Sequence, residues 1–171
     1  MKKKIIARIA AVSAIFFLGA FAFAEGYLSA NDLEKGEITS VKNEEDGFVL
    51  NASAEKNITV DKCPVHTASD GESYTQRIKL NGSGSATARS ISFPAKKGET
   101  IVVRGNSGSK TEARPLLIVN DAGETLTQIN MEADPSGAPL TEGKFKVPAD
   151  GTYTVYSKKS GINLYYIGVV K

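Results

Sequence analysis

The chain contains one histidine and one cysteine, and the two lie close together in the stretch DKCPVHTASDG. Cys63 and His66 have the side chains of a thiolate and its base, or of two ligands of a metal ion. A zinc site needs three or four such ligands, and the chain has no further Cys or His to supply them. Pro64 and the following TASDG predict a turn. We therefore assign no catalytic residue and predict that the chain is not an enzyme.

The stretch GNSGSKT, residues 105–111, has some features of a phosphate-binding loop. Such a loop places Lys directly after its last Gly and lies between a strand and a helix. Here Ser109 separates Gly108 from Lys110, and the residues that follow favour a strand. We interpret the stretch as the tip of a hairpin.

A set of basic residues lies on or beside the predicted strands, and these are our first candidates for ligand binding: Arg77, Lys79, Arg89, Arg104 and Arg114. A sheet face that carries several Arg side chains can bind carboxylates through paired hydrogen bonds. The ligand that fits this chemistry is an acidic polysaccharide. The alternative is that these residues are solvated positions on half-exposed strands.

Tyrosines are the second set of candidates, because the chain has no Trp with which to stack on a sugar ring. Alternation along the strands turns Tyr74, Tyr156 and Tyr165 outward, and we name Tyr156 and Tyr165 as ligand-binding candidates. The alternative is that these rings pack in the core or at a sheet edge.

A structural calcium ion is the one inorganic group that the sequence offers a place for. Asn120, Asp121 and Glu124 in VNDAGE bring oxygen ligands together in one predicted turn, which makes a weak calcium candidate. No other cofactor is indicated.

The elements that would position these residues are short runs with β-type composition. We expect strands at residues 48–52, 57–61, 74–80, 88–93, 100–104, 115–120, 125–131, 144–147, 152–157 and 163–170, with an edge strand at 38–41. Turn-forming Gly, Asn, Asp and Pro residues separate them. Ile91 and Phe93 alternate with Ser90 and Ser92, and in TYTVYS Tyr153 and Val155 alternate with Thr152, Thr154 and Tyr156. This pattern predicts an all-β fold, an antiparallel two-sheet β-sandwich of the jelly-roll type with about nine or ten strands.

The last predicted strand, INLYYIGVV, is the most apolar stretch after the first 24 residues. We expect Ile162, Leu164 and Tyr166 on one face of a central strand, followed by Gly168 and Val170. We also expect a hairpin with GTYTVYS through the short link KKSG.

The first 24 residues form a charged start, an apolar run and a small-x-small ending, which is the pattern of a secretory signal peptide. We therefore expect a secreted or periplasmic protein with no membrane insertion after cleavage. Residues 25–47 are predicted as a polar lead-in, and residues 48–171 as the sandwich domain. Without the leader, acidic residues outnumber basic ones, so net charge does not favour nucleic acid. Cys63 alone cannot form a disulfide within the chain, and it is a buried residue, a free thiol or half of an intermolecular bridge.

Two stretches resemble a known module. YTQRIKLNGSGSATARSISF and the terminal GTYTVYSKKSGINLYYIGVV are similar to an accessory all-β module attached to secreted bacterial pectate lyases and related polysaccharide-degrading enzymes. The resemblance covers roughly residues 36–170 and implies a carbohydrate-binding-type sandwich without lyase activity. The residues on the matching segments are Arg77, Lys79, Arg89, Asn163, Tyr165 and Tyr166.

Two functions follow as hypotheses. The first is a secreted, non-catalytic sandwich that binds polysaccharide, with an anionic, pectin-like glycan as the expected ligand. The second is a structural or protein-interaction sandwich of the bacterial envelope with a protein partner and no sugar ligand.

Overall fold

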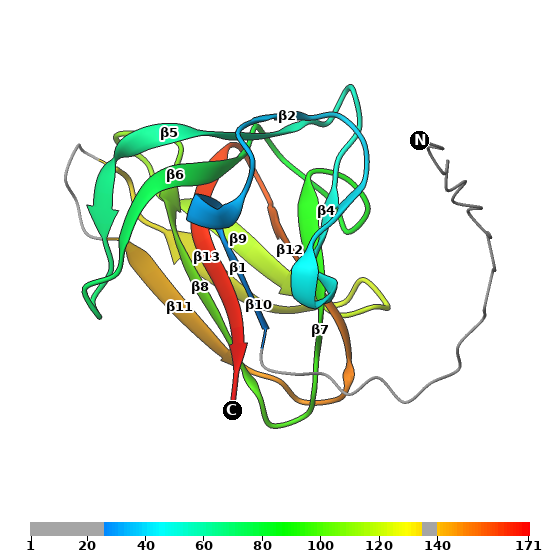
Figure 1. Cartoon of the computed structure of the whole chain (residues 1–171). Helices are drawn as coiled ribbons and strands as arrows, with labels where there is room; N and C mark the ends of the chain where they lie inside the picture. Colours follow the sequence, from blue (N-terminus) through cyan, green and yellow to red (C-terminus); the bar gives the residue numbers. More distant parts are fainter. Residues whose placement is uncertain (1–25, 135–139) are drawn as a thin grey trace, which may run out of the picture.

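Two antiparallel sheets packed face to face make up the protein (Figure 1). The computed structural model describes residues 26–134 and 140–171, and the predicted signal peptide at 1–24 lies outside this range. In the described part, no helix has the length and apolar character needed to cross a membrane.

Seven strands form the first sheet, here called sheet A, in the order β11-β8-β13-β6-β5-β2, with β1 also paired to β13. These strands are β1 (Gly26–Ser29), β2 (Gly36–Ile38), β5 (Ile58–Thr67), β6 (Ser73–Leu80), β8 (Thr100–Ser107), β11 (Thr141–Lys146) and β13 (Ile162–Val170).

Sheet B holds six strands in the order β10-β9-β12-β7-β4-β3. They are β3 (Lys42–Asn43), β4 (Val49–Asn51), β7 (Ser90–Ala95), β9 (Arg114–Val119), β10 (Thr125–Met131) and β12 (Gly151–Ser157). Two short 3-10 turns, η1 (Ala30–Asp32) and η2 (Glu45–Gly47), complete the described elements.

The core lies between the two sheets and follows the period-two pattern of the strands. Ile91 and Phe93 of β7 and Tyr153 and Val155 of β12 all point inward and are buried, as the alternation predicts. The predicted fold class, an all-β antiparallel two-sheet sandwich, is confirmed.

The segment expected as a polar lead-in is part of the sandwich. Its strand β1 pairs with β13 in sheet A, β2 pairs with β5, and β3 pairs with β4 in sheet B. Leu28, Ala30 and Leu33 are buried in the core. A few apolar residues in a mostly polar stretch form this packing, so the average composition of the stretch did not reveal it.

The expected hairpin of the last two strands is wrong. β12 lies in sheet B and β13 in sheet A, so residues 158–161 carry the chain from one sheet to the other. The neighbours of β13 are β8 on one side, and β6 followed by β1 on the other. The GNSGSKT stretch is not a hairpin tip either, because its first three residues end β8 in sheet A and the residues that follow lead to β9 in sheet B.

A β-bulge divides β13 into two halves with opposite facing. Pairing with β8 shifts register between Leu164 and Tyr166, so that Tyr165 is an extra residue on the outer side. After the bulge, Ile167 and Val169 point into the core. The prediction that Ile162 and Leu164 point inward is therefore correct, but the prediction for Tyr166, Gly168 and Val170 is wrong.

The β5–β6 hairpin folds over the outer face of sheet A, and Figure 1 shows the two strands as a strongly curved pair. β6 pairs with β13 only at Ile78–Leu80, and the beginning of β6 separates from β13 while it stays paired with β5. β5 continues through Pro64 to Thr67, with a register shift between Lys62 and His66 that accommodates Pro64. The turn predicted at TASDG follows at the tip of the hairpin, where the backbone N–H of Gly71 donates to the carbonyl oxygen of Ala68 at 3.0 Å. A second buried cluster of Ala68, Tyr74 and Tyr165 fills the space beneath.

Candidate functional site

Three of the predicted basic residues converge on one depression, which we call the basic hollow. It has a volume of about 370 Å³. Its lining is Arg77, Lys79, Leu80, Asn81, Gly108, Arg114, Ser160, Gly161, Ile162 and Asn163. The two sheets meet here, because Arg114 belongs to sheet B and the other basic residues belong to sheet A.

Strand alternation places two of these cations. Ile78 and Leu80 of β6 are fully buried in the core, so Arg77 and Lys79, which alternate with them, face outward. Asn163 of β13 pairs directly with Lys79, which adds an amide to the same outer face.

Arg114 enters the hollow from the start of β9. Its Nη1 donates a hydrogen bond of 2.6 Å to the carbonyl oxygen of Gly161, in the crossing between β12 and β13. A side chain at Gly161 would stand 3.2 Å from the carbonyl of Leu80 and 3.5 Å from Arg114 Nη1. The crossing thus holds the guanidinium beside the end of β6.

One carboxylate moderates the charge of the hollow. Arg77 donates from Nε and Nη2 to Asp61 at 2.7 and 3.3 Å, and Lys79 Nζ lies 3.5 Å from the same carboxylate. Burial opposes the charge of Asp61, but the Arg77 hydrogen bond and the two cations lower its pKa overall. The Asp61 hydrogen bond in turn raises the pKa of Arg77.

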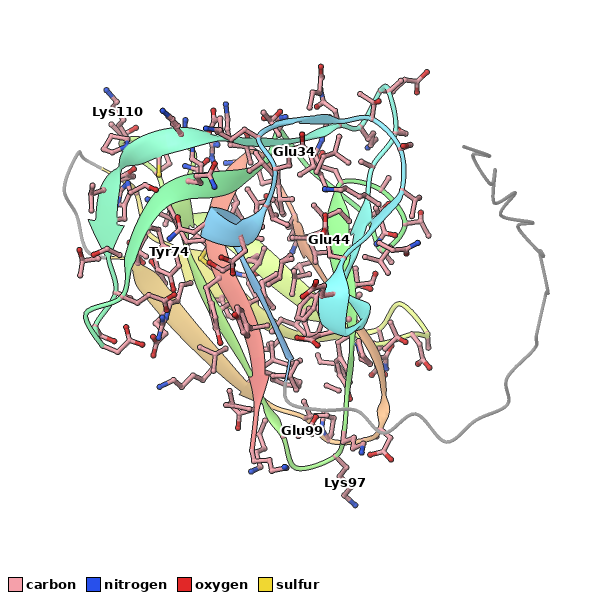
Figure 2. All side chains as sticks on the ribbon, viewed as in Figure 1. Glu34, Glu44, Tyr74, Lys97, Glu99 and Lys110 are labelled. Carbon is pink, nitrogen blue, oxygen red and sulfur yellow. The ribbon has the colours of Figure 1, made fainter. Side chains whose placement is uncertain are left out.

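The lining of the basic hollow still contains three cations and no carboxylate. Arg77 Nη1 takes no part in the Asp61 pair. Lys110, exposed in the loop that contributes Gly108, extends outward (Figure 2), and exposed Lys158 and Lys159 precede Ser160. Positive charge therefore exceeds negative charge around the hollow, even with Asp61 paired to Arg77 and Lys79.

Tyr165 is placed differently from its prediction. It lies on the outer side of sheet A but is 0% exposed, because the β5–β6 hairpin covers it. Its hydroxyl accepts from Asn106 Nδ2 at 3.1 Å, and Asn163 Nδ2 donates to Asn106 Oδ1 at 3.0 Å. Tyr74 packs on it at 5.8 Å between ring centroids and is equally buried. Neither ring can stack on a sugar in this arrangement.

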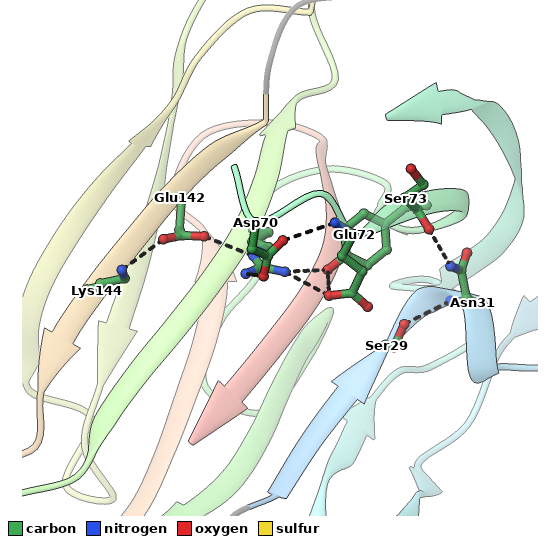
Figure 3. Close-up of polar contacts among 9 residues, drawn as sticks. Ser29, Asn31, Asp70, Glu72, Ser73, Glu142 and Lys144 are labelled. Atoms are coloured by element: carbon green, nitrogen blue, oxygen red, sulfur yellow. Dashed lines mark hydrogen bonds and ion pairs between the residues drawn. The ribbon is translucent and has the colours of Figure 1, made fainter. Parts of the chain in front are cut away.

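Arg104 is also withdrawn from solvent, at the centre of a cluster that we call the arginine clasp. Its guanidinium bonds to Asp70 at 2.5 Å, Glu72 at 2.8 Å and Glu142 at 3.0 Å, and also to the Tyr74 hydroxyl at 2.9 Å (Figure 3). Asp70 and Glu72 come from the tip of the β5–β6 hairpin, so the clasp fastens that hairpin over β13 and onto β8.

The pKa shifts agree with this structural role of the clasp. Burial opposes the charge on Arg104, but the hydrogen bonds with Tyr74, Asp70 and Glu142 raise its pKa overall. A hydrogen bond from Lys144, and then one from Arg104, lowers the pKa of Glu142. Arg104 is thus a permanently charged structural residue.

Arg89 has a structural position of its own. It adopts a positive φ of 53° just before β7. Its guanidinium donates to the carbonyl oxygens of Glu55, Asn57 and Ser83 at 3.2 to 3.3 Å. It therefore ties two loops together and lies outside the lining of the basic hollow.

Tyr156 faces outward on β12, as alternation predicts, but it belongs to sheet B. Its cross-strand neighbours are Leu117 of β9 and Ser90 of β7. Tyr156 is half-buried and is separate from the basic residues of sheet A.

Cys63 and His66 lie on β5 without forming a catalytic pair. Burial raises the pKa of the Cys63 thiol, which is the opposite of what a thiolate nucleophile needs. His66 packs on the Tyr165 ring at 5.0 Å, and its Nε2 lies 3.6 Å from Asp134 Oδ2.

The calcium candidates form the turn between β9 and β10. Asn120 Oδ1 accepts from the Glu124 backbone N–H at 2.9 Å, and Asn120 Nδ2 donates to Glu124 Oε2 at 3.2 Å. Within residues 26–134 and 140–171, no group of three or more His, Cys, Asp or Glu side chains is placed to hold a metal ion. The calcium site stays a prediction.

The residues that sequence reasoning missed are mostly partners of the candidates. Asp61, Asp70, Glu72 and Glu142 all form ion pairs with predicted cations. Alternation in TEGKFK, with Phe145 packed on the core, was a usable signal for Glu142.

Comparisons with known proteins give similarity at the level of structure alone. No family model and no curated protein matches the chain. Similar solved structures include a family 35 carbohydrate binding module from Clostridium thermocellum, with a TM-score of 0.43 and 14% identity over 78% of this chain and 97% of that chain. The CBM36-1 domain of a multidomain xylanase from the hindgut metagenome of Trinervitermes trinervoides has a TM-score of 0.45 and 14% identity, covering 86% of this chain and 98% of that chain.

The C-terminal CBM6 of LamC from Zobellia galactanivorans has a TM-score of 0.41 and 18% identity, covering 66% of this chain and 90% of that chain. All three identities are below 20% and all three TM-scores are below 0.5. The ligand of this chain therefore has to be argued from its own residues.

Proposed function

We propose that this chain is a non-catalytic glycan-binding β-sandwich that takes an anionic polysaccharide in the basic hollow. The observation that carries the proposal is the convergence of Arg77, Lys79 and Arg114 on one depression whose lining contains no carboxylate. These cations come from two sheets and from distant parts of the sequence, so their meeting is a property of the fold.

The donor groups fit a uronate-type sugar. A guanidinium presents paired N–H donors to a carboxylate, and an ammonium adds a point charge. Asn81 is exposed at the rim, and its side-chain oxygen can accept from a sugar hydroxyl group, since its Nδ2 already donates to Asn57 and Thr59. The lining has no aromatic side chain, so charge rather than ring stacking would supply most of the recognition.

Polygalacturonate is the first probe, because the sequence resembles a module attached to pectate lyases. Fully methyl-esterified pectin is the matched control, since it keeps the backbone and removes the charge. Native electrophoresis through gels that contain either polymer is expected to retard the chain in the first gel only. Retardation should fall when salt rises from 0.05 to about 0.5 M, because a surface site is screened.

Two substitutions locate the site. Lys79→Gln and Arg114→Gln each remove one cation and should weaken retardation several-fold, whereas Lys97→Gln, far from the hollow, should leave it unchanged. Equal retardation in both polymers, or retardation that neither substitution alters, would refute the proposal.

Export completes the proposal. A polysaccharide ligand of this kind lies outside the cytoplasm, and the first 24 residues have the pattern of a cleaved leader. N-terminal sequencing of the protein from the culture medium or periplasm should begin at Glu25, and a start at Met1 would contradict this part.

A further inference from the structure

A second hollow lies on the outer face of sheet A, toward the far end of β13. It has a volume of about 340 Å³. Thr100, Val102, Arg104, Glu142, Lys144, Tyr166 and Val170 line it. β13 runs from Asn163 in the basic hollow to Val170 here, so the two depressions mark opposite ends of one strand.

Two tyrosine rings form a platform beside this hollow. Tyr27 of β1 and Tyr166 of β13 are nearly parallel, with an interplanar angle of 16° and 5.9 Å between ring centroids. Tyr27 is 54% exposed, which is unusual for so large a ring. It is therefore available to a ligand, unlike Tyr74 and Tyr165.

The position of the Tyr166 ring depends on a glycine. A Cβ at Gly168 would lie 2.4 Å from the Tyr166 hydroxyl oxygen and 2.6 Å from its ring. The ring therefore extends over Gly168, the direct cross-strand partner of Tyr27. The Arg104 guanidinium lies 5.0 Å from the centroid of the Tyr166 ring and fixes it further.

The charges around this platform are neutralised or negative. Arg104 is committed to three carboxylates, and Lys144 Nζ lies 3.0 Å from Glu142. Tyr27 also borders a neighbouring hollow that contains Asp32, Glu44, Glu45 and Asp46. An anionic sugar would be repelled here, in contrast to the basic hollow.

We infer that the Tyr27–Tyr166 platform is a second glycan-binding site, and that it takes an uncharged pyranose. An aromatic face packs on the apolar face of the sugar ring. The floor adds Val102 and Val170, and Glu142, Lys144 and Thr100 offer acceptors and donors for hydroxyl groups at the rim. The inference goes beyond the anionic site and rests only on the general glycan-binding function.

The test uses the full chain and a panel of neutral polymers, namely β-1,4-galactan, xylan, mannan and β-glucan, in native affinity gels and by titration calorimetry. At least one polymer should be bound. Tyr27→Ala should raise its Kd about three- to tenfold, in line with the loss of one aromatic contact. Tyr27→Phe keeps the ring and should stay within twofold of the wild type.

The outcomes separate this inference from the proposed function. Lys79→Gln should leave binding of the neutral polymer unchanged, and Tyr27→Ala should leave binding of polygalacturonate unchanged. If no neutral polymer is bound, or if Tyr27→Ala binds it as the wild type does, the platform is not a sugar site, even where polygalacturonate is retained. Circular dichroism of Tyr27→Ala should match the wild type, because the ring is largely exposed.

Discussion

Replacing Arg104 by Met tests whether the arginine clasp holds the β5–β6 hairpin against sheet A. Met keeps most of the apolar stem and removes the guanidinium. Asp70, Glu72 and Glu142 then lose their shared cation, and the Tyr166 ring loses the charge 5.0 Å from its centroid.

The magnitude follows from the exposure of each partner. The Asp70 side chain is 52% exposed, so we assign no contribution to the free energy of unfolding to its ion pair with Arg104. The Glu72 side chain is 44% exposed, and a pair of that kind contributes about 0.5 kcal/mol. Glu142 is 22% exposed and its charged hydrogen bond contributes about 1 kcal/mol, with about 0.5 kcal/mol more from the Tyr166 contact. Arg104→Met should therefore lower the free energy of unfolding by about 2 kcal/mol.

Urea denaturation followed by circular dichroism measures this change. Arg104→Lys keeps the charge but not the forked geometry of the guanidinium, so its free energy of unfolding should lie between those of Arg104→Met and the wild type. Lys79→Met is the matched control, because Lys79 has one partner at 3.5 Å and should lose at most about 0.5 kcal/mol. An Arg104→Met protein as stable as the Lys79→Met protein would refute the role of the clasp.

Two further predictions concern the same face of sheet A. Hydrogen bonds from Lys144 and then from Arg104 lower the pKa of Glu142 in the folded protein. The stabilisation that the Glu142 carboxylate contributes is therefore complete above the pKa of Glu142 in the unfolded chain, and it is lost as pH falls through its lower pKa in the folded protein. The stability difference between wild type and Arg104→Met, measured by urea denaturation from pH 7 to pH 2.5, should therefore shrink below about pH 4, and a constant difference would contradict it. Gly168→Ala should displace the Tyr166 ring and lower the free energy of unfolding by about 1–2 kcal/mol, and unchanged Tyr166 ring shifts in NMR spectra would argue against this packing.

Strand alternation made the fold class predictable. The inward positions of Ile91, Phe93, Tyr153 and Val155 could be derived from the sequence, because period two is a local property. The strands that pair with β13 could not be derived in this way. A link as short as residues 158–161 can close a hairpin or cross between sheets, and the choice depends on pairing with β8, which is distant in sequence.

The candidate site was predictable only in its residue types. Arg77, Lys79 and Arg114 were identified as cations near strands, but their meeting depends on how the ends of the two sheets are joined. Arg104 was given the same role on the same evidence, and the folded-over hairpin instead encloses it among carboxylates. Alternation in the sequence does not reveal the one-residue bulge at Tyr165, and this bulge determines which tyrosines of β13 face outward.

Titration of polygalacturonate oligomers into three proteins tests the central claim most directly. Asp61→Asn removes the carboxylate that engages Arg77 and Lys79, and Lys79→Gln removes a cation from the same hollow. We predict that Asp61→Asn binds about two- to fivefold more tightly than wild type and that Lys79→Gln binds several-fold more weakly, because a local charge changes in opposite directions. No measurable binding by the wild type, or equal affinity in all three proteins, would contradict an anionic glycan site in the basic hollow.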